Sequence, residues 1–64
     1  MLIGDRISSL ALQKGITPYR IAKDADISQS YLSELISNKR SNPSLAVLKK
    51  IATALGIPTE KLIN

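Results

Sequence analysis

The chain contains no cysteine and no histidine among its 64 residues. These two absences exclude disulfide bonds, the commonest zinc ligands and the side chain most often used for acid–base catalysis. No apolar run approaches the length of a membrane span, and the first apolar residues are followed at once by Gly4, Asp5 and Arg6, so we expect no signal peptide. A chain this short holds a single domain. We therefore expect one cytoplasmic domain with no metal, cofactor, small-molecule ligand, membrane contact or catalytic residue.

Apolar residues recur with helical spacing along the chain, and no stretch alternates as a strand would. Candidate N-caps are Thr17, Ser28 and Ser44, and candidate helix ends are Gly15 and Gly56. A short last helix is expected to begin near Thr59. The sequence therefore predicts an all-α domain, a compact arrangement of five helices packed round one core.

Residues 17–36 predict two short helices joined by a sharp turn. Pro18 suits the first helical position, because its missing N–H costs nothing there. Asp26 lies at the break between the helices, where a short polar side chain tolerates left-handed backbone. This arrangement is a helix-turn-helix.

The second of these helices has one apolar side and one short, polar side. The apolar stripe consists of Leu32, Leu35 and Ile36. The opposite side carries Ser30, Ser33, Glu34 and Ser37, with Gln29 at the N-terminal end. A globular core does not require such a face, whereas contact with base-pair edges does. The alternative is that these residues form the solvated face of an ordinary surface helix.

The net charge of +4 is concentrated after residue 35. Residues 1–35 carry equal numbers of basic and acidic side chains, whereas residues 36–58 carry Lys39, Arg40, Lys49 and Lys50 and no acid. A basic patch beside an exposed polar helix attracts phosphate. For the last two lysines, a solvated helix face is the simpler interpretation.

Short motifs occur in a fixed order along the whole chain. They are Ile-Gly-x-Arg-Ile at 3–7, Lys-Gly-Ile-Thr at 14–17, Ile-Ala-Lys at 21–23, Ser-x-Ser-Tyr-Leu-Ser at 28–33, Asn-Pro-Ser at 42–44 and Lys-Ile-Ala-x-Ala-Leu-Gly-Ile at 50–57. Together they resemble the lambda-repressor-like helix-turn-helix family, also called the Cro/C1 or XRE type. Within it, residues 30–33 and 42–44 look most like the biofilm and sporulation repressors of spore-forming bacteria. One departure is Asp26, which stands where glycine is usual.

The resemblance implies sequence-specific binding of double-stranded DNA by a bacterial or phage transcriptional regulator. A repressor that occupies an operator, at the nucleoid, is the first interpretation. An autoregulating antitoxin or an activator with the same fold is an alternative within this class. A protein-interaction module that binds another regulator is an alternative from a different class, and a weak salt dependence of binding would distinguish it.

The resemblance also assigns roles to individual residues. Base reading is assigned to Gln29, Ser30, Ser33 and Glu34, whose side chains match adenine, several base edges and cytosine N4. Contacts to the DNA backbone are assigned to Thr17, Tyr19, Arg20, Tyr31, Lys39, Arg40, Asn42 and Ser44. For Tyr31, packing over the turn is an equal alternative. A homodimer on a pseudo-palindromic operator is implied, and the apolar residues left for the dimer contact are Ile57, Leu62 and Ile63.

Overall fold

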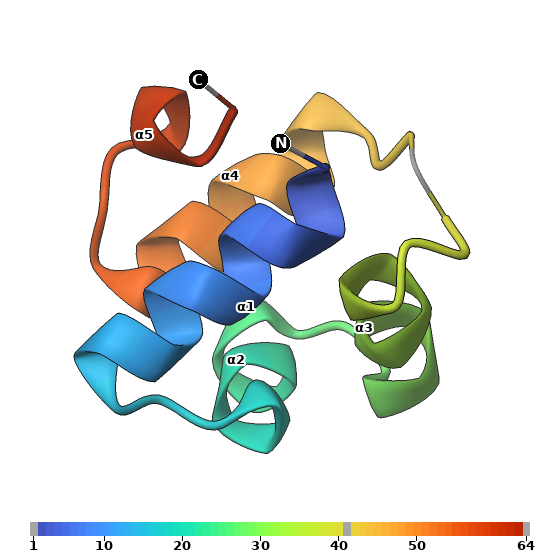
Figure 1. The fold of residues 1–64 in the computed structure, drawn as a ribbon, viewed down its shortest axis with the longest axis horizontal. Coiled ribbons are helices and arrows are strands. Elements are labelled where there is room, and N and C mark those ends of the chain that lie inside the picture. The colour runs from blue at the N-terminus through green and yellow to red at the C-terminus, as the bar shows by residue number, and fades with distance from the viewer. Residues whose placement is uncertain (1, 41, 64) are drawn as a thin grey trace.

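The computed structural model describes residues 2–40 and 42–63, and this part of the chain contains five helices. They are α1 (Ile3–Lys14), α2 (Pro18–Ala25), α3 (Gln29–Ile36), α4 (Leu45–Leu55) and α5 (Thr59–Ile63) (Figure 1). The fold is all-α, which confirms the class predicted from the periodicity of apolar residues. None of the helices in the described ranges is long and apolar enough to cross a membrane.

Three of the helices begin at the N-cap residues that the sequence predicts. The Thr17 hydroxyl accepts a hydrogen bond from the Arg20 N–H at 3.2 Å, the Ser28 hydroxyl from the Tyr31 N–H at 3.0 Å, and the Ser44 hydroxyl from the Val47 N–H at 3.2 Å. Each bond satisfies a first-turn N–H that has no partner within its own helix. Helix α1 differs, because Leu2 stands at its N-cap and offers no side-chain acceptor.

A residue in left-handed backbone directly follows α1, α2 and α4, and after α3 it comes one residue later, behind Ser37. In each case the N–H of the next residue donates to a carbonyl five residues earlier. The left-handed residues are Gly15, Asp26, Asn38 and Gly56, with φ of 67°, 57°, 64° and 71°. The returning bonds are Ile16 to Ala11, Ile27 to Ala22, Lys39 to Glu34 and Ile57 to Ala52, at 2.9 to 3.0 Å. After α1, α2 and α4 the returning residue is an isoleucine packed on the core, whereas after α3 it is an exposed lysine. The end of α3 therefore lacks the apolar contact with the core that follows the other three helices.

The left-handed backbone of Asp26 gives a test of the turn. Replacing Asp26 by glycine should raise the free energy of unfolding by about 0.5 to 1 kcal/mol, because glycine adopts this φ without the Cβ–carbonyl contact. The matched control is Asp24→Gly, the same substitution inside α2, which should lower stability. Thermal unfolding of both variants measures the difference. If both substitutions changed the free energy of unfolding in the same direction, the assignment of strain to this turn would be wrong.

A single apolar core lies between the helices. Its buried members are Ile7, Ala11, Ile21, Ala22, Ala25, Leu32, Leu35, Ile51, Ala52, Leu55 and Leu62. Helix α2 packs most extensively against α4, and α3 packs against α1 and α2. Figure 1 shows α2 and α3 together on one side of the molecule and α5 on the other. Because its neighbours cover only its apolar stripe, α3 keeps its polar side in solvent.

The expected dimer contact at Leu62 is corrected by the structure. Leu62 is only 1% exposed, because α5 packs against α4 and α1 and directs this side chain into the core. Ile57 is half-buried beside the end of α4, and Ile63 is 51% exposed. Of the three residues, Ile63 alone presents a large apolar surface.

Candidate nucleic-acid interface

Helices α2 and α3 are joined by only three residues, and local hydrogen bonds define the turn. The Asp26 N–H contacts the Lys23 carbonyl at 3.3 Å, and the Ile27 N–H contacts the Ala22 carbonyl at 3.0 Å. Ser28 then caps α3. Ile27 packs on the core, which anchors the turn between the two helices. The chain therefore turns from α2 into α3 within three residues, as the helix-turn-helix interpretation requires.

The outward side of α3 is polar and accessible. Gln29, Ser30 and Ser33 are exposed, whereas Leu32 and Leu35 on the opposite side are 1% and 0% exposed. Three small or short polar side chains leave this side of the helix free of bulky aliphatic groups. The amide and hydroxyl groups can both donate and accept hydrogen bonds.

A shallow hollow of about 240 Å³ lies where the start of α2 meets the outward side of α3. It is lined by Pro18, Tyr19, Gln29, Leu32, Ser33 and Ile36. The helix-turn-helix thus brings Tyr19 beside two of the residues assigned to base reading. The lining of this hollow combines apolar side chains with polar ones.

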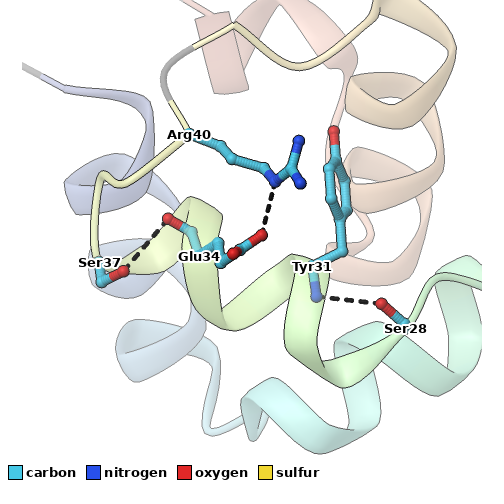
Figure 2. A network of polar contacts seen from close by, with 5 residues as sticks. All are labelled: Ser28, Tyr31, Glu34, Ser37 and Arg40. Atoms are coloured by element: carbon cyan, nitrogen blue, oxygen red, sulfur yellow. Dashed lines mark hydrogen bonds and ion pairs between the residues drawn. The ribbon is translucent and has the colours of Figure 1, made fainter.

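Glu34, Tyr31 and Arg40 form a network on α3 and the loop that follows it (Figure 2). The Arg40 Nε donates a hydrogen bond to Glu34 Oε1 at 2.5 Å, and the guanidinium carbon lies 5.3 Å from the centroid of the Tyr31 ring. This hydrogen bond and the attraction to the Glu34 charge raise the pKa of Arg40 above its ordinary value. The residue assigned to reading cytosine therefore already contacts a residue assigned to phosphate.

The backbone of Glu34 also shapes the loop after α3. Its carbonyl accepts hydrogen bonds from the Lys39 N–H at 2.9 Å, the Arg40 N–H at 3.2 Å and the Ser37 hydroxyl at 3.2 Å. Figure 2 shows the last of these bonds beside the Glu34–Arg40 contact. The loop consequently folds back on the end of α3, and this places the backbone of Lys39 and Arg40 next to that helix.

Asn38 is a structural residue whose role sequence reasoning missed. Its Oδ1 accepts a hydrogen bond from the Gly4 N–H at 3.1 Å, and its Nδ2 donates to Asp5 Oδ1 at 3.0 Å. Asn38 therefore supplies the N-terminal cap that α1 lacks. The sequence indicates that an asparagine suits left-handed backbone. It contains no signal for a partner 34 residues away.

The remaining residues assigned to the DNA backbone lie in separate places. Thr17 and Ser44 cap α2 and α4, and Arg20 contacts Asp24 at 3.4 Å on the exposed side of α2. Asn42 lines a different hollow, of about 230 Å³, together with Arg6 and Ile63. The structure thus gathers Tyr31, Glu34, Lys39 and Arg40 at the end of α3 but places Asn42 toward α1 and α5.

The helix-turn-helix family matches residues 7–62 of the chain. The chain belongs to this family. The family resemblance read from the ordered motifs is thereby confirmed, and so is the five-helix architecture that it implies.

Two sequence relatives show the kind of protein in which such domains occur. The immunity repressor protein of Bacillus phage phi105 is 36% identical over 64 residues, which is 100% of this chain and 44% of the relative. The HTH-type transcriptional regulator SinR of Bacillus licheniformis is 33% identical over 63 residues, which is 98% of this chain and 57% of the relative. The chain thus spans about half the length of these curated relatives.

Solved structures show the same fold. The master regulator for biofilm formation SinR, in a crystal structure of its complex with DNA, has a TM-score of 0.91 at 32% identity, covering 98% of this chain and 100% of that chain. The restriction-modification controller protein C.AhdI from Aeromonas hydrophila has a TM-score of 0.87 at 32% identity, covering 94% of this chain and 89% of that one.

Proposed function

We propose that this chain is the DNA-binding domain of a transcriptional regulator, which binds a specific double-stranded operator and represses the promoter there. The observation that carries the proposal is the exposed polar side of α3, formed by Gln29, Ser30 and Ser33. It belongs to a helix-turn-helix whose fold matches that of SinR in a complex with DNA. Such a protein acts in the cytoplasm, at the nucleoid.

In this proposal α3 lies in the major groove, and its side chains contact base edges. Gln29 would form two hydrogen bonds with adenine N6 and N7, and the serine hydroxyls suit several edges. Lys39 and Arg40 contact phosphates that flank the groove. Thr17 and Ser44 bind the Arg20 and Val47 N–H groups, so the further phosphate donors would be the remaining first-turn N–H groups, of Tyr19 in α2 and of Leu45 and Ala46 in α4.

Two copies would bind a pseudo-palindromic operator together. One recognition helix contacts too few base pairs for useful specificity, and half-sites one DNA turn apart place two copies about 34 Å from centre to centre. The Cα atoms extend over 23 × 23 × 20 Å, so two copies at this spacing would lie side by side. Ile63 is the exposed apolar residue of the proposed contact, and the small area predicts weak dimerisation in the absence of DNA.

Selection of bound sequences from a random duplex pool tests the proposal. We expect a recurring sequence with two related half-sites and a shift in sedimentation corresponding to two copies per duplex. Recovery of no recurring sequence would contradict specific binding. One copy per duplex at saturation, with a recurring sequence, would contradict the dimer alone.

Gln29→Ala should weaken binding to the selected duplex by about 1 to 3 kcal/mol and relax the preference at one base pair in each half-site. The reason is that alanine removes both hydrogen bonds to one base while leaving the phosphate contacts in place. Selection repeated with the variant measures the lost preference. Lys39→Ala is the control, because it should weaken selected and random duplexes alike. If Gln29→Ala also weakened both duplexes equally, it would not be a base reader.

A further inference from the structure

The contact between Glu34 and Arg40 uses only one of the five N–H donors of the guanidinium. The hydrogen bond runs from Nε, and no hydrogen bond from the two terminal nitrogens to residues 2–40 or 42–63 occurs in the structure. Figure 2 shows one of these nitrogens pointing away from the Glu34 carboxylate and the other beside the Tyr31 ring. The four terminal N–H groups therefore keep the fork that matches the oxygens of a phosphate.

Three features hold Arg40 in this orientation. The carboxylate of Glu34 contacts its Nε, the face of the Tyr31 ring lies 5.3 Å from its guanidinium carbon, and the Glu34 carbonyl accepts its backbone N–H at 3.2 Å. Two of the three contacts come from Glu34. A long, exposed arginine side chain without such contacts would lose considerable rotamer freedom on meeting a phosphate.

The charge of Glu34 is difficult to reconcile with an independent role in the major groove. A carboxylate beside DNA is repelled by phosphates unless a cytosine contact or a positive charge compensates it. Arg40 supplies that positive charge within the protein. A cytosine contact would require the same oxygens to turn away from Arg40.

We propose that Glu34 is a positioning residue rather than a base reader. It holds the Arg40 guanidinium against Tyr31 so that the terminal amino groups are presented to a DNA phosphate at the end of α3. This inference rests on the proposed DNA-binding function. An isolated carboxylate near DNA should weaken binding because phosphates repel it, whereas in this role Glu34 strengthens binding.

Two substitutions of Glu34 test this role. Glu34→Gln and Glu34→Ala carry the same charge, but only glutamine keeps an oxygen that can accept a hydrogen bond from Arg40. We expect wild type to bind both selected and random duplexes most tightly, glutamine to be intermediate and alanine weakest, with about 3-fold to 10-fold between wild type and alanine. In proteins that also carry Arg40→Ala, this order of affinities should disappear. Glu34 then has no arginine partner, so replacing its carboxylate should leave DNA affinity unchanged or raise it.

Other outcomes overturn the inference. Tighter binding by both Glu34 variants would mean that the carboxylate only repels DNA or competes with phosphate for Arg40. A changed preference at one base pair, present in both backgrounds, would make Glu34 a base reader. Equal affinities of all three proteins would mean that Arg40 needs no positioning. The matched control is Glu60 on α5, where the same two substitutions should give equal affinities.

A measurement without DNA separates this inference from the proposed function. The Arg40 Nε–H resonance should exchange with water more slowly than that of Arg20, whose contact with Asp24 is longer, at 3.4 Å. Glu34→Ala should abolish the difference, and its absence in wild type would overturn the inference. If wild type bound no duplex in a salt-dependent manner, the proposed function would fail, while this exchange measurement would still report whether Glu34 holds Arg40.

Discussion

Replacing Gly4 by alanine is expected to lower the free energy of unfolding by about 3 kcal/mol or more. A Cβ at this position would meet the backbone oxygens of Leu35 and Ile36 and the side-chain oxygen of Asn38, all closer than 3.0 Å. Two of these atoms are backbone, so they move only if α1 and α3 separate. Separation would also leave the Gly4 N–H without its acceptor.

The expected loss runs against helix propensity. Gly4 lies inside α1 without positive φ, where alanine normally stabilises a helix by about 1 kcal/mol. Chemical denaturation measures the effect. Gly15→Ala is the control, because it strains a φ of 67° with nothing within 4 Å of the added Cβ, and about 1 kcal/mol is expected. A Gly4→Ala variant as stable as wild type would show that α1 and α3 are not in close contact.

The close approach at Gly4 matters for function because it orients α3. Asn38 lies two residues after the end of α3, and its contacts with Gly4 and Asp5 join the end of this helix to the start of α1. A variant that separates these elements should therefore weaken DNA binding as well as stability. Gly4→Ala should lower both stability and DNA affinity, whereas Gly15→Ala should lower stability alone.

Affinity for DNA is expected to fall about 100-fold as salt rises from about 50 mM to about 200 mM. This estimate assumes a dimer in which Lys39 and Arg40 of each copy neutralise about four phosphates in total, each phosphate contributing about 0.9 to the logarithmic slope. With Lys39→Ala, two phosphate contacts are lost per dimer, and the loss over the same range should shrink to about 10-fold. Titrations of a fluorescent duplex at several salt concentrations measure the slope.

The control for the salt series is Lys61→Ala, which removes the same charge from α5, a helix that packs against α4 and α1. Its slope should stay close to that of wild type. Equal changes for the two lysines would show that net charge, rather than a local phosphate contact, sets the salt dependence. A slope near zero for wild type would favour a protein partner over DNA.

The dimer contact shows the limit of reasoning from apolar pattern alone. Ile57, Leu62 and Ile63 follow the last long helix and have no assigned role in the sequence, so all three were expected at an interface. The structure places Leu62 in the core, because α5 packs back on α1 and α4. A five-residue helix shows too little periodicity for its buried side to be predicted.

By itself, the sequence determined the helices, their caps at Thr17, Ser28 and Ser44, and the polar side of α3. These features depend on periodicity and on hydrogen bonds that span only three or four residues. The left-handed residue Asp26 is equally local, since its bonds return to the preceding helix. Local contacts of this kind form wherever the residues occur in that order.

Only the tertiary structure decided how α3 is joined to the rest of the domain. The cap that α1 receives from Asn38 spans 34 residues, and the space that demands glycine at position 4 exists only after α1 packs on α3. The loop after α3 likewise determines that Glu34 contacts Arg40 instead of standing free in solvent. Such contacts depend on where the backbone places distant groups, because a side chain's donors and acceptors do not specify which partner will reach them.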